Sequence, residues 1–366
     1  MYPNDIRPLT SLRIVAAIWV LAYHFRDHLG LDVDRLGLVA KGYLGVDLFF
    51  ILSGFILSHV YLGRFEAKQF NYGSFLWARL SRIYPVHLVT LAATIAIWLV
   101  GMKMGATFDP VAFDPAVLPQ HLLLIHAWGT TPFVQWNFPS WSISAEWFAY
   151  LAFPAAAVLV LAFRRAAWAA VVVALGAFAL MFWAVESHGL PLPEVTRLGF
   201  IRIIPAFLLG AALYQFGRTV SLPRWLALGG AAGAVCWIVI ASTLRLSDAA
   251  IWPAFGLLIF SLAETSKTSA RGVMSAAWLV YLGEVSYSVY MTHLPVDIAY
   301  FHTLDRLAPG VTGAAARVAW VGVFVATLLV SMATYHLVER PARNWMRAND
   351  PFSRKPLSEP PHEPVI

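Results

Sequence analysis

The sequence predicts an all-α polytopic membrane protein with about ten transmembrane helices and both termini in the cytoplasm. Composition is the first observation: 59% of the 366 residues are hydrophobic and 13% are charged, whereas about a quarter of the residues of a soluble protein are charged. The second is the recurrence of apolar windows of about 17 to 24 residues, the length that crosses a bilayer. The third is the concentration of lysine and arginine in alternate loops between these windows.

The apolar windows form one expected transmembrane domain, residues 5–347. The chain begins without the basic, apolar and small-residue pattern of a cleaved signal, so we expect the first helix to remain. Segment 102–140 is too polar and proline-rich to cross, and its piece HLLLIHAW, residues 121–128, is expected to lie at the interface or to re-enter. Residues 348–366 predict a disordered cytoplasmic tail. The ten expected helices lie near residues 9–27, 44–62, 80–101, 142–163, 167–185, 198–217, 225–243, 249–264, 277–300 and 316–337.

Loop charges set the expected orientation. With the N-terminus inside, 17 of the 26 basic residues fall on the inner face, which is the bias of cytoplasmic loops. The net charge of +6 therefore belongs to the cytoplasmic face, and we expect no nucleic-acid partner. The inner residues are Arg7, Arg13, Arg64, Lys68, Arg79, Arg82, Arg164, Arg165, Arg218, Arg224, Lys267, Arg271, Arg340, Arg343, Arg347, Arg354 and Lys355.

The first expected helix carries two ionisable residues, Arg13 and His24, in an apolar run. They are 11 positions apart, which is about 16 Å along a helix and brings both side chains to one face. Ionisable groups in a bilayer are costly and usually face a protein interior or a water-filled cavity. We expect Arg13 and His24 to lie at the inner and outer ends of one line through the protein.

The second and fourth expected helices run inward and bring polar residues toward the depth of His24. The second opens with GYLGVDLFF, so Asp47 enters near the outer end, where the helix dipole alone also favours a carboxylate. The fourth opens with PSWSISAEW, with Trp141 and Ser142 at its start. Glu146 lies one turn deeper than Ser142 on the same face, and a structural ion pair is its ordinary alternative.

The ninth expected helix runs outward through VSYSVYMTHLP. Tyr287, Tyr290 and His293 form a stripe at intervals of three residues that climbs into the outer half. We therefore expect His293 to lie at a depth similar to that of His24, Asp47 and Glu146.

The third expected helix enters the bilayer with Arg79 and Arg82 one turn apart, at the same inner level as Arg13. Arginine forks suit phosphate oxygens, so the inner mouth is predicted to bind phosphate. Basic residues also anchor cytoplasmic helix ends without binding any ligand.

Two other polar groups have structural interpretations. Glu339 and Arg340 are expected to tie down the end of the tenth helix. His121 and His126 are five positions apart in a loop, which is poor spacing for a metal without a third ligand. We expect no metal.

Six segments in order resemble motifs of the acyltransferase 3 family of membrane O-acyltransferases. Arg13 and His24, ten residues between them, resemble its first-helix signature, and GVDLFFILSGF resembles its second-helix motif. SFLWARLSRIYP resembles its Arg-x-x-Arg segment, and PSWSISAEW its Trp-Ser…Glu segment. YSVYMTHLP and YHLVERPARNW resemble its last two helices. The chain resembles a stand-alone member, without the extracytoplasmic SGNH-type domain that some members append.

The resemblance implies an enzyme of the bacterial cytoplasmic (inner) membrane that moves a short acyl group, commonly acetyl, from cytoplasmic acyl-coenzyme A to a hydroxyl. The acceptor is often a sugar of a surface polysaccharide or exopolysaccharide, a lipopolysaccharide or a lipid-linked glycan, and an amphipathic small molecule such as a macrolide is the alternative. Arg13, Arg79 and Arg82 would bind the phosphates of acetyl-CoA, and the pantetheine arm would reach the outer half. Oligomeric state stays open.

For the chemistry, we expect His24 to remove the hydroxyl proton and return a proton to the leaving thiolate. Glu146 would orient His24, as a carboxylate does in hydrolytic triads. A transient acyl-histidine is the second possibility. Tyr287 and His293 would bind the acceptor or polarise the thioester carbonyl, and Asp47 would bind substrate or anchor a helix end. The expected substrate-binding residues are Asp47, Trp141, Ser142, Tyr287 and His293.

Two other classes of protein use similar residues. Intramembrane Arg, His, Asp and Glu also build the proton relays of transporters, but transporters often contain inverted repeats and the sequence contains no evident repeat. A sensor that binds acyl-coenzyme A without turnover is the third class.

Overall fold

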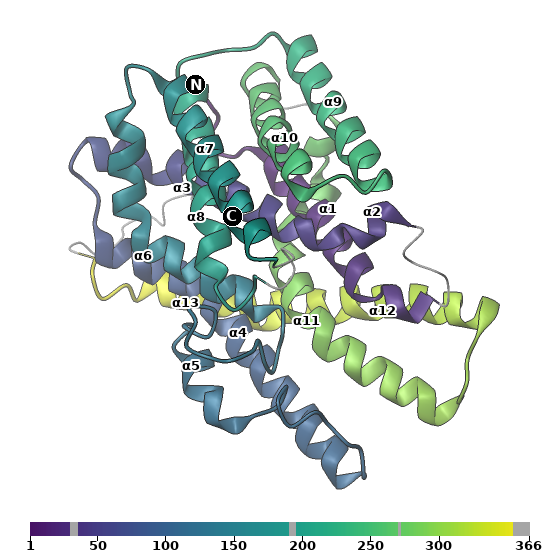
Figure 1. Ribbon diagram of the computed structural model, residues 1–366. Helices are drawn as coiled ribbons and strands as arrows, with labels where there is room; N and C mark the ends of the chain where they lie inside the picture. The colour runs from purple at the N-terminus through teal and green to yellow at the C-terminus, as the bar shows by residue number, and fades with distance from the viewer. Residues whose placement is uncertain (30–35, 190–194, 270–271, 354–366) are drawn as a thin grey trace.

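Helices, and no β-strand, make up the regular structure of residues 1–29, 36–189, 195–269 and 272–353, which the computed structural model describes (Figure 1). Each of the ten expected windows coincides with a helix of 18 residues or more. These helices are α1 (Arg7–His24), α3 (Gly45–Glu66), α4 (Tyr72–Lys103), α6 (Ser140–Ala162), α7 (Ala167–Ser187), α8 (Gly199–Gly217), α9 (Arg224–Thr243), α10 (Asp248–Thr268), α11 (Ala277–Leu307) and α12 (Gly313–Thr334).

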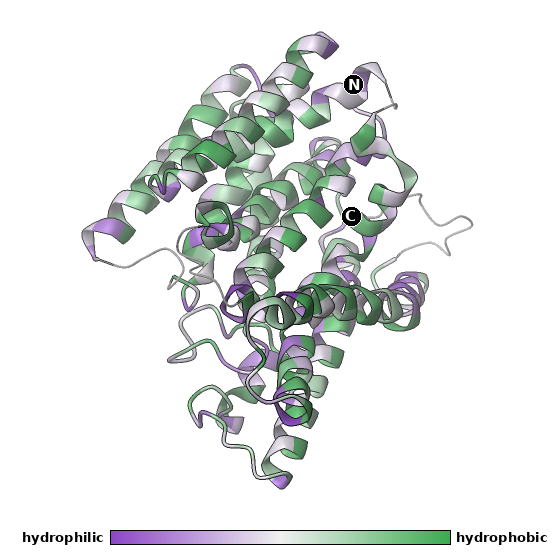
Figure 2. Ribbon diagram, turned by 90° about the vertical axis from the view of Figure 1, so that its right-hand side faces the viewer, coloured by the Kyte–Doolittle hydropathy of each residue, from purple (hydrophilic) through white to green (hydrophobic). Residues whose placement is uncertain are grey.

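Within the described residues, eight of these helices are long and apolar enough to cross a membrane. The other two, α1 and α11, contain polar residues of the predicted site, including His24 and His293. Figure 2 shows hydrophobic residues along most of the helices and hydrophilic residues at helix ends and in loops. The fold class is therefore that of a polytopic α-helical membrane protein, as the sequence predicts.

Small residues allow the helices that carry the site to pack closely. A Cβ at Gly283 of α11 would lie 2.0 Å from the carbonyl oxygen of Thr10 in α1. A Cβ at Gly54 of α3 would likewise lie 2.0 Å from the carbonyl oxygen of Phe207 in α8. Side chains at these points would force the backbones apart. These contacts hold α1 against α11 and α3 against α8, as the element contacts also show.

The segment between α4 and α6 forms no spanning helix, as expected. Its short helix α5 (Leu118–Leu122) folds back along α4 near the lower end of the molecule in Figure 1. The Tyr84 hydroxyl donates to the carbonyl oxygen of Leu122 over 3.1 Å, and a ring nitrogen of His87 lies 2.9 Å from the carbonyl oxygen of His121.

The two terminal segments lie beside the connection between α3 and α4. The carbonyl oxygen of Asn4 lies 3.4 Å from a ring nitrogen of His59 in α3. The indole of Trp77 in α4 donates over 2.6 Å to the carbonyl oxygen of Met346 in α13 (Arg340–Ala348). Both terminal segments therefore lie near the same end of the bundle, where α3 ends and α4 begins.

The predicted tail begins in an ordered turn. Asn71 donates over 2.9 Å to the carbonyl oxygen of Phe352, and the backbone of Phe352 donates to the carboxylate of Asp350. These first tail residues are therefore ordered against α4, whereas Arg354, Lys355 and the rest of the tail lie outside the described residues.

Candidate active site

A cavity enclosed by the N-terminal segment, α1, α3, α4, α6 and α11 has an empty volume of about 990 Å³, including its open mouth. Six of the ten predicted site residues line it: Arg13, Arg79, Arg82, Ser142, Glu146 and Tyr287. The other four, His24, Asp47, Trp141 and His293, do not.

Three arginines gather in this cavity, as the sequence predicts. Arg79 and Arg82 are buried on α4, with 2% and 4% of their surface exposed, and Arg13 faces them from α1. Nη1 of Arg13 and Nη2 of Arg82 are buried and have no hydrogen-bond partner among the described residues. Buried donors without partners are costly, so these two guanidinium groups favour an anionic ligand.

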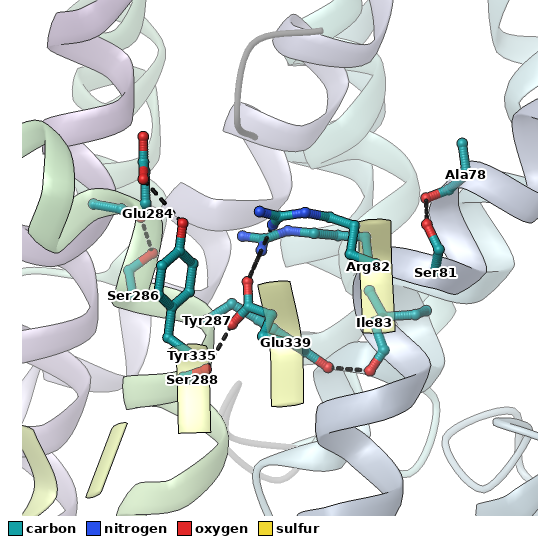
Figure 3. Close-up of polar contacts among 12 residues, drawn as sticks. Ala78, Ser81, Arg82, Ile83, Glu284, Ser286, Tyr287, Ser288, Tyr335 and Glu339 are labelled. Carbon is teal, nitrogen blue, oxygen red and sulfur yellow. Dashed lines mark hydrogen bonds and ion pairs between the residues drawn. The ribbon is translucent and has the colours of Figure 1, made fainter. Parts of the chain in front are cut away.

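Other guanidinium nitrogens of Arg79 and Arg82 contact neighbouring side chains. Nη1 of Arg82 pairs with Glu339, which also accepts a hydrogen bond of 2.6 Å from the Ser288 hydroxyl (Figure 3). Nη2 of Arg79 donates to the Tyr61 hydroxyl over 3.2 Å. Glu339 follows the end of α12 in a π-helical turn (Tyr335–Glu339). Its expected structural role is thus more specific than a helix anchor, because it orients Arg82.

Tyr287 stands beside Arg82 and is also fixed by the backbone. Its hydroxyl donates to the carbonyl oxygen of Ile83 over 2.5 Å, and the guanidinium of Arg82 lies 5.3 Å from its ring centre. Tyr287 therefore belongs to the arginine-lined cavity and not to an outer cluster with His24.

Glu146 is placed differently from the prediction that it orients His24. It lines the arginine cavity and accepts a hydrogen bond of 2.6 Å from the Ser53 hydroxyl. No hydrogen bond joins Glu146 to His24 in the described part of the chain. The reason is depth: Glu146 lies six residues into α6, about 9 Å from its outer end, whereas His24 is the last residue of α1.

His24 instead lies beside a second histidine. Its ring centre is 4.8 Å from that of His293, 5.9 Å from that of Phe138 and 5.3 Å from that of Tyr23. His293 is fully buried. The structure thus places His24 beside His293, in agreement with the similar depth predicted for them, whereas no described hydrogen bond joins either histidine to Glu146.

Tyr290 and Ser142 form the end of the cavity nearest the histidines. The Ser142 hydroxyl lies 2.8 Å from the Tyr290 hydroxyl, which donates to the carbonyl oxygen of Pro139 over 3.0 Å. The ring of Tyr290 lies 5.7 Å from that of His293. Tyr290 therefore connects the arginine cavity, which it lines, to His293 and its neighbour His24.

Asp47 forms a buried ion pair with an arginine for which the sequence predicts no role, and Trp141 packs against that arginine. Arg202 of α8 donates from Nε and Nη2 to the two carboxylate oxygens of Asp47, over 3.2 and 2.6 Å. The guanidinium lies 4.8 Å from the Trp141 ring centre. All three side chains are at most 3% exposed. This geometry favours the helix-anchoring alternative for Asp47.

Other cavity residues were also missed. Ser53 and Tyr150 lack a distinctive sequence signal, because hydroxyl residues are common in membrane helices. Asn4 and Asp5, at the mouth, precede the first apolar window. Arg202 did have a signal, since an arginine inside an apolar window is rare and usually paired.

His121 and His126 form a stacked group with His87. The His121 and His126 rings lie 3.9 Å apart at 12°, and those of His126 and His87 lie 6.2 Å apart at 6°. Burial, together with the smaller effect of the neighbouring His87, lowers the pKa of His121, in the loop helix α5, to about 3. Within the described residues, no group of three His, Cys, Asp or Glu is arranged to hold a metal ion.

The chain is similar to several known proteins along most of its length. The family model described as "Acyltransferase domain" matches residues 8–336. The chain is 31% identical to Acyltransferase MdmB of Streptomyces mycarofaciens, over 83% of this chain and 82% of that protein. It is 25% identical to Putative membrane-bound transacylase BcsY of Komagataeibacter xylinus, over 92% and 83%. It is 21% identical to Peptidoglycan O-acetyltransferase OatA of Listeria monocytogenes, over 92% of this chain and 55% of that protein. No solved structure matches the chain.

Proposed function

The chain belongs to the acyltransferase 3 family, and we propose that this multi-pass membrane acyltransferase moves a short acyl group, commonly acetyl, from cytoplasmic acyl-coenzyme A to a sugar hydroxyl. The observation that carries the proposal is the convergence of Arg13, Arg79 and Arg82 in one cavity. We place the enzyme in the bacterial inner membrane, with the cavity mouth at Asn4 and Asp5 on the cytoplasmic side.

The arginine cavity suits the chemistry of acetyl-CoA. The unpartnered nitrogens of Arg13 and Arg82 would bind phosphate oxygens, which arginine recognises through charge-assisted hydrogen bonds. Apolar residues such as Leu9 and Ile56 also line the cavity and would contact the thin pantetheine arm. The carboxylate of Glu146 would accept a hydrogen bond from a pantetheine amide, a role that replaces the predicted pairing with His24.

The proposed reaction brings the thioester to the outer end of the cavity, at Tyr290 and Ser142. His24 lies next to this end of the cavity, beside His293, and acts as the base. It removes the proton of the acceptor hydroxyl, the oxygen attacks the thioester carbonyl, and the carbon–sulfur bond breaks. His24 then returns the proton to the thiolate, so the products are the ester and free coenzyme A and no net proton is released.

A glycan is the acceptor class that we favour. One relative is named for O-acetylation of peptidoglycan, which is a glycan, although the chain covers only 55% of that protein. An amphipathic small molecule such as a macrolide is the alternative acceptor. Exopolysaccharide, lipopolysaccharide and lipid-linked oligosaccharides are the glycans to test first.

The test uses the purified full-length protein with acetyl-CoA labelled in the acetyl group and a panel of these acceptors. Acceptor-dependent formation of a labelled ester supports the proposal. Binding without turnover would support a sensor, and accumulation of unmodified substrate in vesicles would support a transporter.

Variants assign the chemistry in the same assay. His24→Ala is expected to lower kcat by about 10² to 10⁴-fold, the usual contribution of a general base. His28→Ala is the matched control, because His28 lies in the next turn and pairs with Asp297 over 3.3 Å. Near-normal transfer by His24→Ala would exclude the proposed base. A labelled protein adduct trapped without acceptor would indicate an acyl-histidine instead of direct transfer.

A further inference from the structure

His24, at the end of α1, and His293, in the middle of α11, form a pair whose separate roles the proposed function leaves open. We infer that His293 is a positioning residue, which holds His24 in the tautomer and orientation that a general base needs. This inference rests on the proposed role of His24. His293 thus has the positioning role that the sequence predicts for Glu146.

The backbone of α11 determines which nitrogen of His293 carries the proton. Nδ1 of His293 lies 2.5 Å from the carbonyl oxygen of Tyr290, one turn earlier. A carbonyl oxygen only accepts hydrogen bonds, so the Nδ1 of a neutral His293 is the donor. Its Nε2 then carries a lone pair and can only accept.

The turn of α11 that holds His293 is itself fixed by a neighbouring loop. Pro295 lacks a backbone N–H, so the carbonyl oxygen of Met291 loses its normal partner within the helix. The side-chain amide of Asn137 donates to this oxygen over 3.1 Å. Asn137 is fully buried, so the loop before α6 holds the Pro295 turn in place and, with it, the orientation of His293.

His293 has an unoccupied hydrogen-bond acceptor, Nε2, close to the ring of His24. Nε2 of His293 is buried and has no hydrogen-bond partner within the described parts of the chain. The His24 ring, 4.8 Å away with a tilt of 45°, is nearer to His293 than the rings of Tyr290 at 5.7 Å and Phe25 at 6.1 Å. A donor N–H of His24 is therefore the group best placed to occupy this lone pair.

A hydrogen bond from His24 to Nε2 of His293 would determine which nitrogen of His24 acts as the base. When one nitrogen of His24 donates to Nε2 of His293, the other nitrogen of His24 bears the lone pair that removes the hydroxyl proton. The resulting imidazolium is stabilised by the same acceptor, as a carboxylate stabilises the histidine of a hydrolytic triad. His293 keeps its own proton on Nδ1 throughout, so the overall proton balance of the transfer is unchanged.

The test compares three substitutions of His293 in the acetyl-transfer assay. His293→Gln places an amide oxygen near the position of Nε2, His293→Asn keeps a polar group near Nδ1 only, and His293→Phe keeps the ring without either. We expect kcat to fall about 100-fold in His293→Asn and His293→Phe, which is the scale of positioning partners. We expect His293→Gln to recover at least about tenfold of that loss, with the KM for acetyl-CoA unchanged within about twofold in all three.

A double-substitution cycle shows whether His293 acts through His24. His24→Ala combined with His293→Gln or His293→Phe is expected to be no slower than His24→Ala alone, because the positioned group is already absent. Additive losses, equal losses in all three variants, or a kcat within threefold of wild type in His293→Phe would each overturn the inference. If the wild-type protein transferred no acetyl group, the proposed function itself would fail; if it did, and only His293→Phe stayed active, the inference alone would fail.

Discussion

The buried pair of Asp47 and Arg202 separates a structural from a substrate-binding interpretation of Asp47. Substitution of Asp47 by Asn removes the charge that Arg202 contacts through two hydrogen bonds. Both side chains are at most 1% exposed, so the guanidinium would stay buried without its counter-ion. Removing one partner of such a pair costs about 3 to 5 kcal/mol. With an unfolding entropy that scales with length, this is a decrease of about 4 to 7 °C in Tm for a chain of this size.

The assay is thermal unfolding of purified protein in detergent, followed by tryptophan fluorescence, together with steady-state kinetics on the surviving folded fraction. Asp47→Leu combined with Arg202→Met is the compensating control, because an apolar pair of similar volume removes both buried charges. We expect this pair to recover most of the lost Tm, and Asp47→Asn to leave the KM for the acceptor nearly unchanged. A Tm within 1 °C of wild type together with a raised acceptor KM would show that Asp47 binds substrate and that the structural argument is wrong.

Three more predictions follow from the cavity, the helix contacts and the loop histidines. Arg13→Gln is expected to raise the KM for acetyl-CoA about 10- to 100-fold, which corresponds to the loss of one charge-assisted hydrogen bond. Arg64→Gln, on the exposed inner face, is expected to leave this KM unchanged. Equal effects of the two substitutions would refute a specific donor site. Gly283→Val is expected to abolish the folded monomer in size-exclusion chromatography, because its side chain would meet the backbone of α1, whereas Gly229→Val, with open space around it, folds normally. The pKa of His121 is about 3 in the folded state and about 6.5 in the unfolded state. The contribution of His121 to the free energy of unfolding is therefore fully present above pH 6.5 and is lost as the pH falls toward 3, by at most about 1.4 kcal/mol per pH unit. A Tm profile between pH 7 and 5 that His121→Gln does not flatten would contradict this assignment.

The course of the helices could be predicted from the sequence because it depends on local properties. Apolar length and loop charge are read residue by residue, and all ten windows became helices. The gathering of Arg13 with Arg79 and Arg82 could also be predicted, because depth along a helix follows from residue counting. The same counting predicted a similar depth for His24 and His293, which agrees with the contact between their rings.

The pairing of side chains could not be predicted, because it depends on helix rotation and on loops. Glu146 was expected beside His24 from an approximate depth, but it lies six residues, about 9 Å, into α6 and lines the arginine cavity instead. Arg202 was missed as the partner of Asp47 because no local pattern relates α3 to α8. The contact between Asn137 and α11 likewise depends on how a loop folds back.

The most direct test of the central claim is acetyl transfer by proteoliposomes of known orientation, with acetyl-CoA supplied on one side only. We expect transfer to require donor on the face that carries the N-terminal segment and the cavity mouth at Asn4 and Asp5. The rate should fall to background in His24→Ala and stay normal in His28→Ala. Transfer that occurs only with donor on the opposite face, or that survives in His24→Ala, would refute the proposed donor site or the proposed base.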